Sequence, residues 1–273
     1  MSKSPARSYL FVPGHRADRF DKACDAGADV VILDLEDAVA PSDKVSARAA
    51  VQEWLAGPRS ARAAIAVRTN AADTDWFAAD IAMCAEARLP FVMLPKAEST
   101  AQLDRVVAAY EPGPAPVLLP LIESAQGFYA ASLIAGHPDV ERLVFGSIDF
   151  SVDMGISGDT DELLYFRSQL VLISRIGNLL APVDGVSTSI DDAELVTADT
   201  LRARRLGFGA KLCIHPKQVA VVNDAFAPTA QEIAWAQRVM EVAANSNGAA
   251  VALDGKMVDR PVILKAQGIL RLA

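Results

Sequence analysis

The sequence predicts a (β/α)8 (TIM) barrel followed by a short C-terminal helical extension, and three observations lead to this fold class. Eight short apolar or β-branched runs alternate with longer Ala-rich, charged stretches that have helical spacing. Polar residues gather at or just past the carboxyl ends of those runs, where a barrel of this kind builds its active site. The alternation stops near residue 220, where a different pattern begins.

The eight predicted strands are nearly continuous apolar runs. They cover residues 8–12, 29–35, 63–68, 90–95, 116–123, 142–148, 181–187 and 209–214. Between them lie predicted helices such as 15–27, 73–87, 99–110 and 191–207, several of which end at Gly. Apolar strands separated by helices indicate a parallel sheet with its outer face covered. Eight such units favour a closed barrel, and a doubly wound open sheet is the alternative.

The predicted barrel covers residues 1–220, and residues 221–273 form the predicted extension. A long Ala-rich helix at 229–245 is followed by a stretch with Gly and Asn turn signals and by a final short helix. This extension is too short to bury a large core alone. We therefore expect it to pack on the barrel or on a neighbouring subunit.

Composition excludes several classes of function. The chain of 273 residues is 52% hydrophobic and 22% charged, with a formal net charge of -8, so no broad surface for nucleic acid or anionic membrane is expected. Three well-separated cysteines without a CxxC spacing argue against a disulfide framework or a zinc site. No apolar run reaches the roughly 18 residues of a membrane span. We expect a cytoplasmic protein.

Two predicted strands end in a carboxylate. Glu123 closes the run PVLLPLIE, and Asp149 follows the run RLVFGSI. A carboxylate at such a place must be paired, hydrogen-bonded or bound to a metal, and Mg²⁺ typically takes one or two protein carboxylates. The chain has only three histidines, which disfavours a zinc-type cluster. By this reasoning alone the two acids either bind Mg²⁺ or cap the helices that follow them.

Several motifs, in order along the chain, carry a resemblance to a known family. They are RSYLFVPGHRADRF, VILDLEDAVAPSDKVSAR, VRTN, LPKAES, LPLIESAQG, FGSIDFSVDMG, LCIHPKQV and GKMVDRP. The chain resembles the citrate lyase β-subunit-like (CitE-like) family of the HpcH/HpaI aldolase and malate synthase-like barrel superfamily. The resemblance implies a (β/α)8 barrel, a Mg²⁺ ion, and carbon–carbon lyase or ligase chemistry on acyl thioesters in a homotrimer or hexamer.

The resemblance also implies roles for four residues. Glu123 and Asp149 match the two metal ligands of the family, and Arg68 of VRTN matches an arginine that contacts the substrate carboxylate and the developing oxyanion. Asp259 of GKMVDRP matches an aspartate that thioester lyases deliver into the active site of an adjacent subunit. A structural ion pair for Arg68 and a surface turn for Asp259 are the alternative interpretations.

Further charged residues are assigned from their positions. Glu36 and Asp37 of DLEDAV are expected either to orient Arg68 or metal-bound water, or to have a structural role only. A net acidic chain must gather basic residues locally to hold the phosphates of a CoA-like carrier. The residues proposed for that contact are Arg7, Arg16, Lys96 and Lys211.

The predicted function is a Mg²⁺-dependent lyase that cleaves a 3-hydroxyacyl thioester of malyl-CoA, citramalyl-CoA or citryl-thioester type. The products are an acyl thioester and a 2-oxo acid. CoA or an acyl carrier protein would hold the thioester. Two alternatives stay open: a carrier-free class II pyruvate aldolase, and a non-catalytic, anion-binding barrel subunit.

Overall fold

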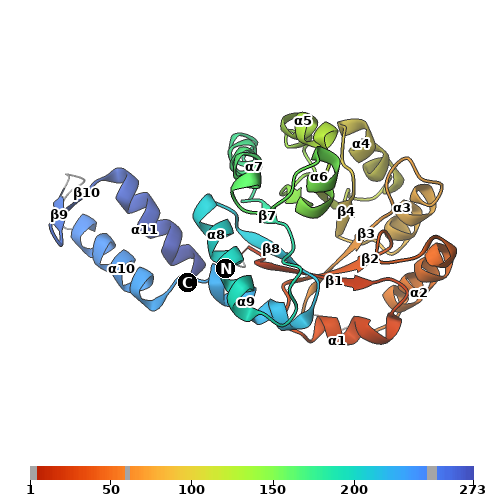
Figure 1. Cartoon of the computed structure of the whole chain (residues 1–273), viewed down its shortest axis with the longest axis horizontal. Coiled ribbons are helices and arrows are strands. Elements are labelled where there is room, and N and C mark those ends of the chain that lie inside the picture. The colour runs from red at the N-terminus through yellow and green to blue at the C-terminus, as the bar shows by residue number, and fades with distance from the viewer. Residues whose placement is uncertain (1–4, 59–61, 245–250) are drawn as a thin grey trace. The chain divides into compact units, whose positions relative to one another are not determined.

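The computed structural model describes residues 5–58, 62–244 and 251–273. The chain divides into two compact units. One comprises residues 6–223, and the other holds Pro5 and the described residues from 224 onward. The division falls three residues after the predicted boundary at 220, inside a helix, and Figure 1 shows the two units coloured along the chain.

The first unit is built on a closed barrel of eight parallel strands, as predicted. They are β1 (Ser8–Pro13), β2 (Val30–Asp34), β3 (Ala64–Arg68), β4 (Phe91–Leu94), β5 (Val117–Ile122), β6 (Val144–Phe145), β7 (Val183–Asp184) and β8 (Ala210–Cys213). The barrel closes where β8 pairs with β1, with Leu10 opposite Cys213. This closure excludes the doubly wound open sheet.

Helices follow the strands and surround the barrel (Figure 1). They are α1 (Phe20–Cys24), α2 (Lys44–Ala56), α3 (Phe77–Glu86), α4 (Thr100–Ala109), α5 (Ala125–Ile134), α6 (Ser147–Met154), α7 (Leu164–Ile176), α8 (Ala193–Leu206) and α9 (Pro216–Phe226). Local sequence starts several of them. Ser99 and Gln102 form a capping box at α4, and the Asp192 side chain accepts a hydrogen bond from the Leu195 N–H at α8.

Two strands are much shorter than the sequence predicted. Residues 142–148 were expected to be extended, but β6 ends at Phe145 and α6 begins at Ser147. Only β7 residues Val183 and Asp184 are extended within the predicted run 181–187. Pro182 has no N–H for the ladder, which limits β7 at its start. The early start of α6 moves Asp149 from a strand exit into the first turn of a helix.

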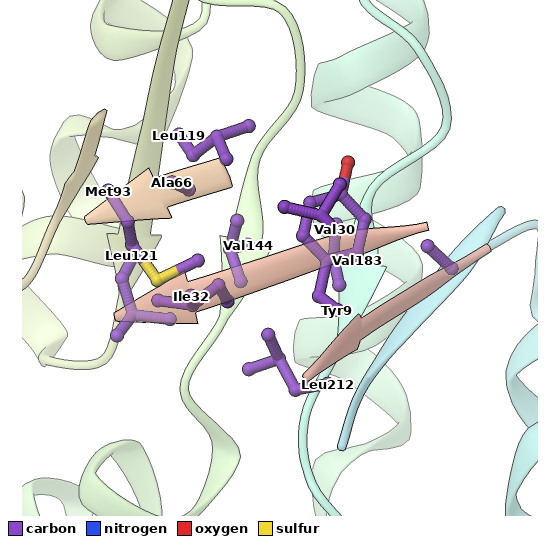
Figure 2. Close-up of a cluster of buried hydrophobic side chains, with 11 residues drawn as sticks. Tyr9, Val30, Ile32, Ala66, Met93, Leu119, Leu121, Val144, Val183 and Leu212 are labelled. Carbon is purple, nitrogen blue, oxygen red and sulfur yellow. The ribbon is translucent and has the colours of Figure 1, made fainter. Parts of the chain in front are cut away.

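The barrel interior is filled by side chains that alternate along the strands. Figure 2 shows this cluster, to which neighbouring strands contribute Val30, Ile32, Ala66, Met93 and Leu121. All are at most 3% exposed. Since side chains alternate between the two faces of a strand, the next inward positions are Asp34, Arg68 and Glu123. The apolar core therefore ends, at the carboxyl ends of the strands, in a layer of charged residues.

The second unit consists of two helices and a hairpin. Helix α10 (Ala230–Ala244) packs against α11 (Arg260–Leu272), and β9 (Val251–Leu253) pairs antiparallel with β10 (Lys256–Val258). A small buried cluster of Ala236, Val239, Val258 and Ala266 holds these elements together. Within the described residues, no helix is both long enough and apolar enough to cross a membrane.

Candidate active site

A cavity of about 540 Å³ lies at the carboxyl ends of the barrel strands. Its charged lining residues are Asp34, Asp37, Arg68, Glu123 and Asp149. Four carboxylates therefore face one guanidinium. This excess of negative charge is unfavourable in a concave site unless a cation enters or carboxylates take up protons.

Glu123 lies at the bottom of this layer and is 3% exposed. Its Oε1 accepts a hydrogen bond of 2.8 Å from the Lys96 N–H, whereas its Oε2 is buried without a hydrogen-bond partner. Burial, followed by the nearby Glu36 carboxylate, raises the pKa of Glu123 to about 8. Gly146 makes room for this side chain, because a Cβ at Gly146 would meet Glu123 Oε2 at 2.7 Å.

The two predicted metal ligands line the same cavity. Asp149 projects from the first turn of α6 and is exposed, and its charge contributes to the raised pKa of Glu123. Among the residues that the structure describes, no three acidic, His or Cys side chains form a metal cluster. Mg²⁺ does not require one, since it commonly keeps several waters beside one or two carboxylates. The unpartnered Glu123 oxygen and the acidic lining fit such an ion.

Arg68 ends β3 and is held in a fixed orientation. Its Nε and Nη2 donate to the two oxygens of Asp34, each at 2.7 Å, and its Nη1 lies 2.8 Å from Glu36 Oε2. The guanidinium also lies over the Phe11 ring, 4.8 Å from its centroid. Burial lowers the pKa of Arg68, but Asp34 and Glu36 outweigh it and the pKa is raised, so the group stays charged.

Glu36 and Asp37 lie beside Arg68, but Asp34 is its principal partner. Glu36 is 5% exposed, and burial raises its pKa to about 7 although Arg68 acts in the opposite direction. Asp37 Oδ2 is 3.6 Å from Arg68 Nη1, and its side chain is largely exposed. Sequence reasoning assigned no role to Asp34; the available signal was its place near the end of the apolar run 29–35, two residues before Glu36 and so on the same face of the strand.

Lys44, which the sequence did not single out, fastens the loop that carries Glu36. Its ammonium donates to the carbonyl oxygens of Leu35 at 2.8 Å and Glu36 at 2.7 Å, and it lies 5.5 Å from the centroid of the Trp76 ring. The residue is 6% exposed. Its sequence position, within the polar stretch PSDKVSAR, gave no signal of this burial.

The four basic residues proposed for phosphate contact occupy different environments. Arg7 precedes the first residue of β1, at the opposite end of the barrel from the cavity, and does not line it, so the structure does not bring it together with the other predicted site residues. Lys211 is 1% exposed and donates to the Gly185 carbonyl, so it is not open to a carrier phosphate. Its neighbours in β8, Ala210 and Leu212, face the barrel core, and alternation turns Lys211 to the outer side.

The other two basic residues lie on the carboxyl side of the barrel. Arg16 follows β1 and makes two hydrogen bonds to Asp18, at 2.8 and 2.7 Å. Lys96 follows β4 with a positive φ of 46°, and its backbone N–H bonds to Glu123. The Lys96 ammonium is half exposed and lies 3.5 Å from Glu36 Oε1. A contact of Arg16 or Lys96 with phosphate stays a prediction.

Asp259 belongs to the second unit, where it caps α11. Its side chain accepts a hydrogen bond of 3.3 Å from the Val262 N–H. Such a cap gives Asp259 a structural role that needs no catalysis. Its expected entry into the active site of an adjacent subunit stays a prediction.

Comparison with known proteins assigns the chain to a family. Residues 7–216 match the sequence model described as HpcH/HpaI aldolase/citrate lyase. The chain belongs to the HpcH/HpaI aldolase/citrate lyase family. Membership places it among enzymes that make or break carbon–carbon bonds, as the motifs predicted.

Relatives in the HpcH/HpaI family cover both units of the chain. A citrate lyase subunit beta-like protein of Mycobacterium tuberculosis is 37% identical over 97% of this chain and 94% of its own length. A (3S)-malyl-CoA thioesterase of Cereibacter sphaeroides is 34% identical over 98% of this chain and 95% of its own length. A crystal structure of CitE from M. tuberculosis, in complex with magnesium, acetoacetate and coenzyme A, superposes with a TM-score of 0.85 at 35% identity. That match covers 99% of this chain and 98% of the other.

Proposed function

We propose that this protein is a Mg²⁺-dependent lyase that cleaves a 3-hydroxyacyl-CoA thioester into an acyl-CoA and a 2-oxo acid. The single observation that carries the proposal is the cavity in which Glu123, with its unpartnered Oε2, and Asp149 face the fixed guanidinium of Arg68. The M. tuberculosis structure that holds magnesium and coenzyme A together supports the same chemistry.

The reaction breaks the bond between the hydroxyl-bearing carbon and the carbon next to the thioester. The hydroxyl proton leaves to solvent water, the hydroxyl carbon becomes the carbonyl of the 2-oxo acid, and the bonding electrons form the enolate of the acyl thioester. Mg²⁺ held by Glu123 and Asp149 would supply positive charge to the substrate carboxylate and hydroxyl oxygens.

Arg68 and Asp259 have separate roles in the proposed reaction. The planar Arg68 fork binds a carboxylate or the forming carbonyl oxygen, and Asp34 and Glu36 hold it in place before substrate arrives. Asp259 relays a proton from solvent water to the enolate carbon, a general acid–base step worth about 10²- to 10⁴-fold in rate. The proposal assigns this Asp259 to an adjacent copy of the chain in a trimer or hexamer.

A Mg²⁺-dependent assay tests the proposal. The protein is incubated with malyl-, citramalyl- and citryl-CoA, with Mg²⁺ or with EDTA, and the 2-oxo acid is detected. We expect product only with Mg²⁺. Asp149→Asn should lower kcat/KM by at least about 10²-fold, because it removes a charged ligand. Asp153→Asn, one turn later on the same helix, is the matched control and should keep activity.

The identity of the product separates the alternatives. A malyl-CoA thioesterase is a second candidate, favoured by the C. sphaeroides relative. It would release free CoA thiol without a 2-oxo acid.

A carrier-free pyruvate aldolase would exchange the methyl protons of pyruvate without any thioester and without Asp259. Absence of both turnover and Mg²⁺-dependent binding of a 2-oxo acid would favour a non-catalytic, anion-binding barrel. An acyl carrier protein as thioester donor is tested by replacing CoA with that carrier.

A further inference from the structure

The wall of the cavity divides into a charged half and an apolar half. The charged residues come from β2, β3 and the segments after β5 and β6. The other half is lined by Phe11 of β1, Val186 after β7, and Leu212 and Ile214 in and after β8. Since β7 pairs with β8 and β8 with β1, these side chains come from adjacent strands and the segments that follow them, and we call them the apolar wall.

Charged residues of β7 and β8 face away from the cavity. Asp184 accepts a hydrogen bond of 2.8 Å from Arg167 of α7 and lies 3.9 Å from the Lys211 ammonium. All three are at most 1% exposed and none lines the cavity. The Lys211 ammonium is further committed to the Gly185 carbonyl at 2.6 Å. Neither Arg167 nor Lys211 is therefore free to turn toward a ligand at the apolar wall.

From this arrangement we propose that the 2-oxo acid fragment of the substrate is a monocarboxylate whose remaining substituent is a short alkyl group. The inference rests on the proposed lyase function and narrows its substrate class. The substrate carbon that carries the hydroxyl has three other substituents: the carboxylate, the thioester arm and one further group. With the carboxylate and hydroxyl directed to Arg68 and the acids, the further group meets the apolar wall.

A methyl group at the apolar wall buries apolar surface, which is favourable. A carboxymethyl group, as in a citryl thioester, would place a second carboxylate there without a partner, and burial of an unpaired charge is strongly unfavourable. Arg68, the one basic residue in the described lining, already binds Asp34 and Glu36. The structure therefore favours a citramalyl-type over a citryl-type thioester.

A neighbouring hollow of about 460 Å³ does not change this conclusion. It shares Ser147, Ile148 and Val186 with the cavity and contains Arg202. Arg202 Nη2 lies 3.3 Å from Asp199 and 3.5 Å from Asp159, which are ion-pair distances without a hydrogen bond, and Asp159 is paired more closely with Arg167, at 2.7 Å. The charged side chains that line this hollow are Asp159, Asp199 and Arg202, so a distal carboxylate there would face two carboxylates and one guanidinium.

Substrate competition and one wall variant test the proposal. The wild-type protein is assayed with citramalyl-, malyl- and citryl-CoA under Mg²⁺. We expect kcat/KM for citramalyl-CoA to exceed that for malyl-CoA by about 10-fold or more, the range for one methyl group in an apolar pocket. For citryl-CoA we expect a deficit of at least about 10²-fold. Val186→Arg should reduce this deficit at least tenfold, and the uncharged Val186→Met should not.

Ligand binding gives a readout that does not depend on turnover. In thermal-shift titrations with Mg²⁺, pyruvate and 2-oxobutyrate should stabilise the protein at concentrations at least tenfold lower than oxaloacetate. Equal kcat/KM for citryl- and citramalyl-CoA, or tighter binding of oxaloacetate, would overturn the proposal. So would a Val186→Arg variant that weakens inhibition by free CoA with unchanged selectivity, because the apolar wall would then hold the carrier arm. If no thioester is cleaved, the proposed lyase function is wrong. The order in which pyruvate, 2-oxobutyrate and oxaloacetate bind then still shows which substituent the apolar wall accepts.

Discussion

At the scale of single residues, burial decides how the acids of the cavity behave. Glu36 and Glu123 are 5% and 3% exposed, and their pKa values are raised to about 7 and about 8. Asp34 is as deeply buried, but its two oxygens accept hydrogen bonds from Arg68 Nε and Nη2 and from the backbone N–H groups of Glu36 and Ala38. Acids with similar burial therefore differ in how completely their charge is compensated: Glu36 Oε2 lies 2.8 Å from the Arg68 guanidinium, whereas Glu123 Oε2 is buried without a hydrogen-bond partner.

The raised pKa values predict how stability depends on pH in the absence of metal. Both glutamates have an ordinary value of 4.5, so between pH 4.5 and about 8 the folded chain binds more protons than the unfolded chain. Their contribution to the free energy of unfolding is fully present below pH 4.5 and is lost as pH rises through about 7 and about 8. We expect that loss to be visible in urea unfolding series in EDTA from pH 5 to 8.5.

Glu123→Gln is the control for this pH dependence. The variant removes one of the two titrating groups, so it should flatten the pH dependence between 7 and 8.5. In the wild type, Mg²⁺ should restore most stability at the alkaline end, because the ion binds the deprotonated carboxylates. A stability that rises from pH 6 to 8 in EDTA by the same amount in wild type and variant would contradict the assignment.

At the scale of elements, the loop between β2 and α2 acts as a support for Arg68. Lys44, at the start of α2, joins the Leu35 and Glu36 carbonyls, and the Glu36 carboxylate then lies 2.8 Å from the guanidinium. The orientation of a side chain on β3 therefore depends on a cation that precedes it by 24 residues in sequence. Fixed geometry of this kind matters, since small displacements of a substrate-binding group greatly reduce rates.

Replacement of Lys44 tests this support. Lys44→Met removes the ammonium donor from the Leu35 and Glu36 carbonyls, of which the Glu36 carbonyl keeps the Val39 N–H, and should cost about 1–3 kcal/mol in the free energy of unfolding. Lys211→Met is the matched control, because Lys211 is also buried and donates to a backbone carbonyl, but behind the apolar wall. Both variants should melt at lower temperature. Only Lys44→Met should lower kcat, by about 10²-fold, when both are assayed well below their melting temperatures. Equal losses of kcat would show that Lys44 supports the fold alone.

At the scale of the whole molecule, the proposed site needs a residue from each unit. Glu123, Asp149 and Arg68 belong to the barrel, and Asp259 caps α11 in the second unit. If Asp259 acts in the barrel of another copy, each copy contributes its barrel residues to one active site and its Asp259 to a different one. This arrangement predicts complementation between defective copies.

Mixed oligomers test this sharing. We expect the Glu123→Gln variant and the Asp259→Asn variant each to be inactive when assayed alone. Asn keeps the cap of α11, because its side-chain oxygen accepts the same hydrogen bond. Mixing the two variants under conditions that exchange subunits should restore activity, since some sites then combine an intact barrel with an intact Asp259. No recovery, with exchange verified by native mass spectrometry of tagged chains, would mean that each copy uses its own Asp259 or none.

Much of the fold and part of the site were predictable from local patterns. The alternation of apolar runs and helical stretches predicted the eight strands, because a strand that is buried on both faces must be apolar along most of its length. The polar residues at the strand ends predicted the face on which the cavity lies. The extent of β6 and the burial of Lys211 were not predictable, because each depends on where a neighbouring element starts or which side of a strand is covered. Arg7 could have been placed at the amino end of the barrel, because it precedes the predicted strand 8–12.

The sequence alone determined that this chain is a parallel barrel of the HpcH/HpaI aldolase/citrate lyase family with acids at its strand ends, because periodicity and motifs are properties of short segments. Tertiary structure decided which of those acids share a cavity, that Asp34 and not Asp37 holds Arg68 most closely, and that one half of the wall is apolar. The physical reason is closure of the barrel. Closure brings strands that are distant in sequence around one axis, and only then do their charges meet.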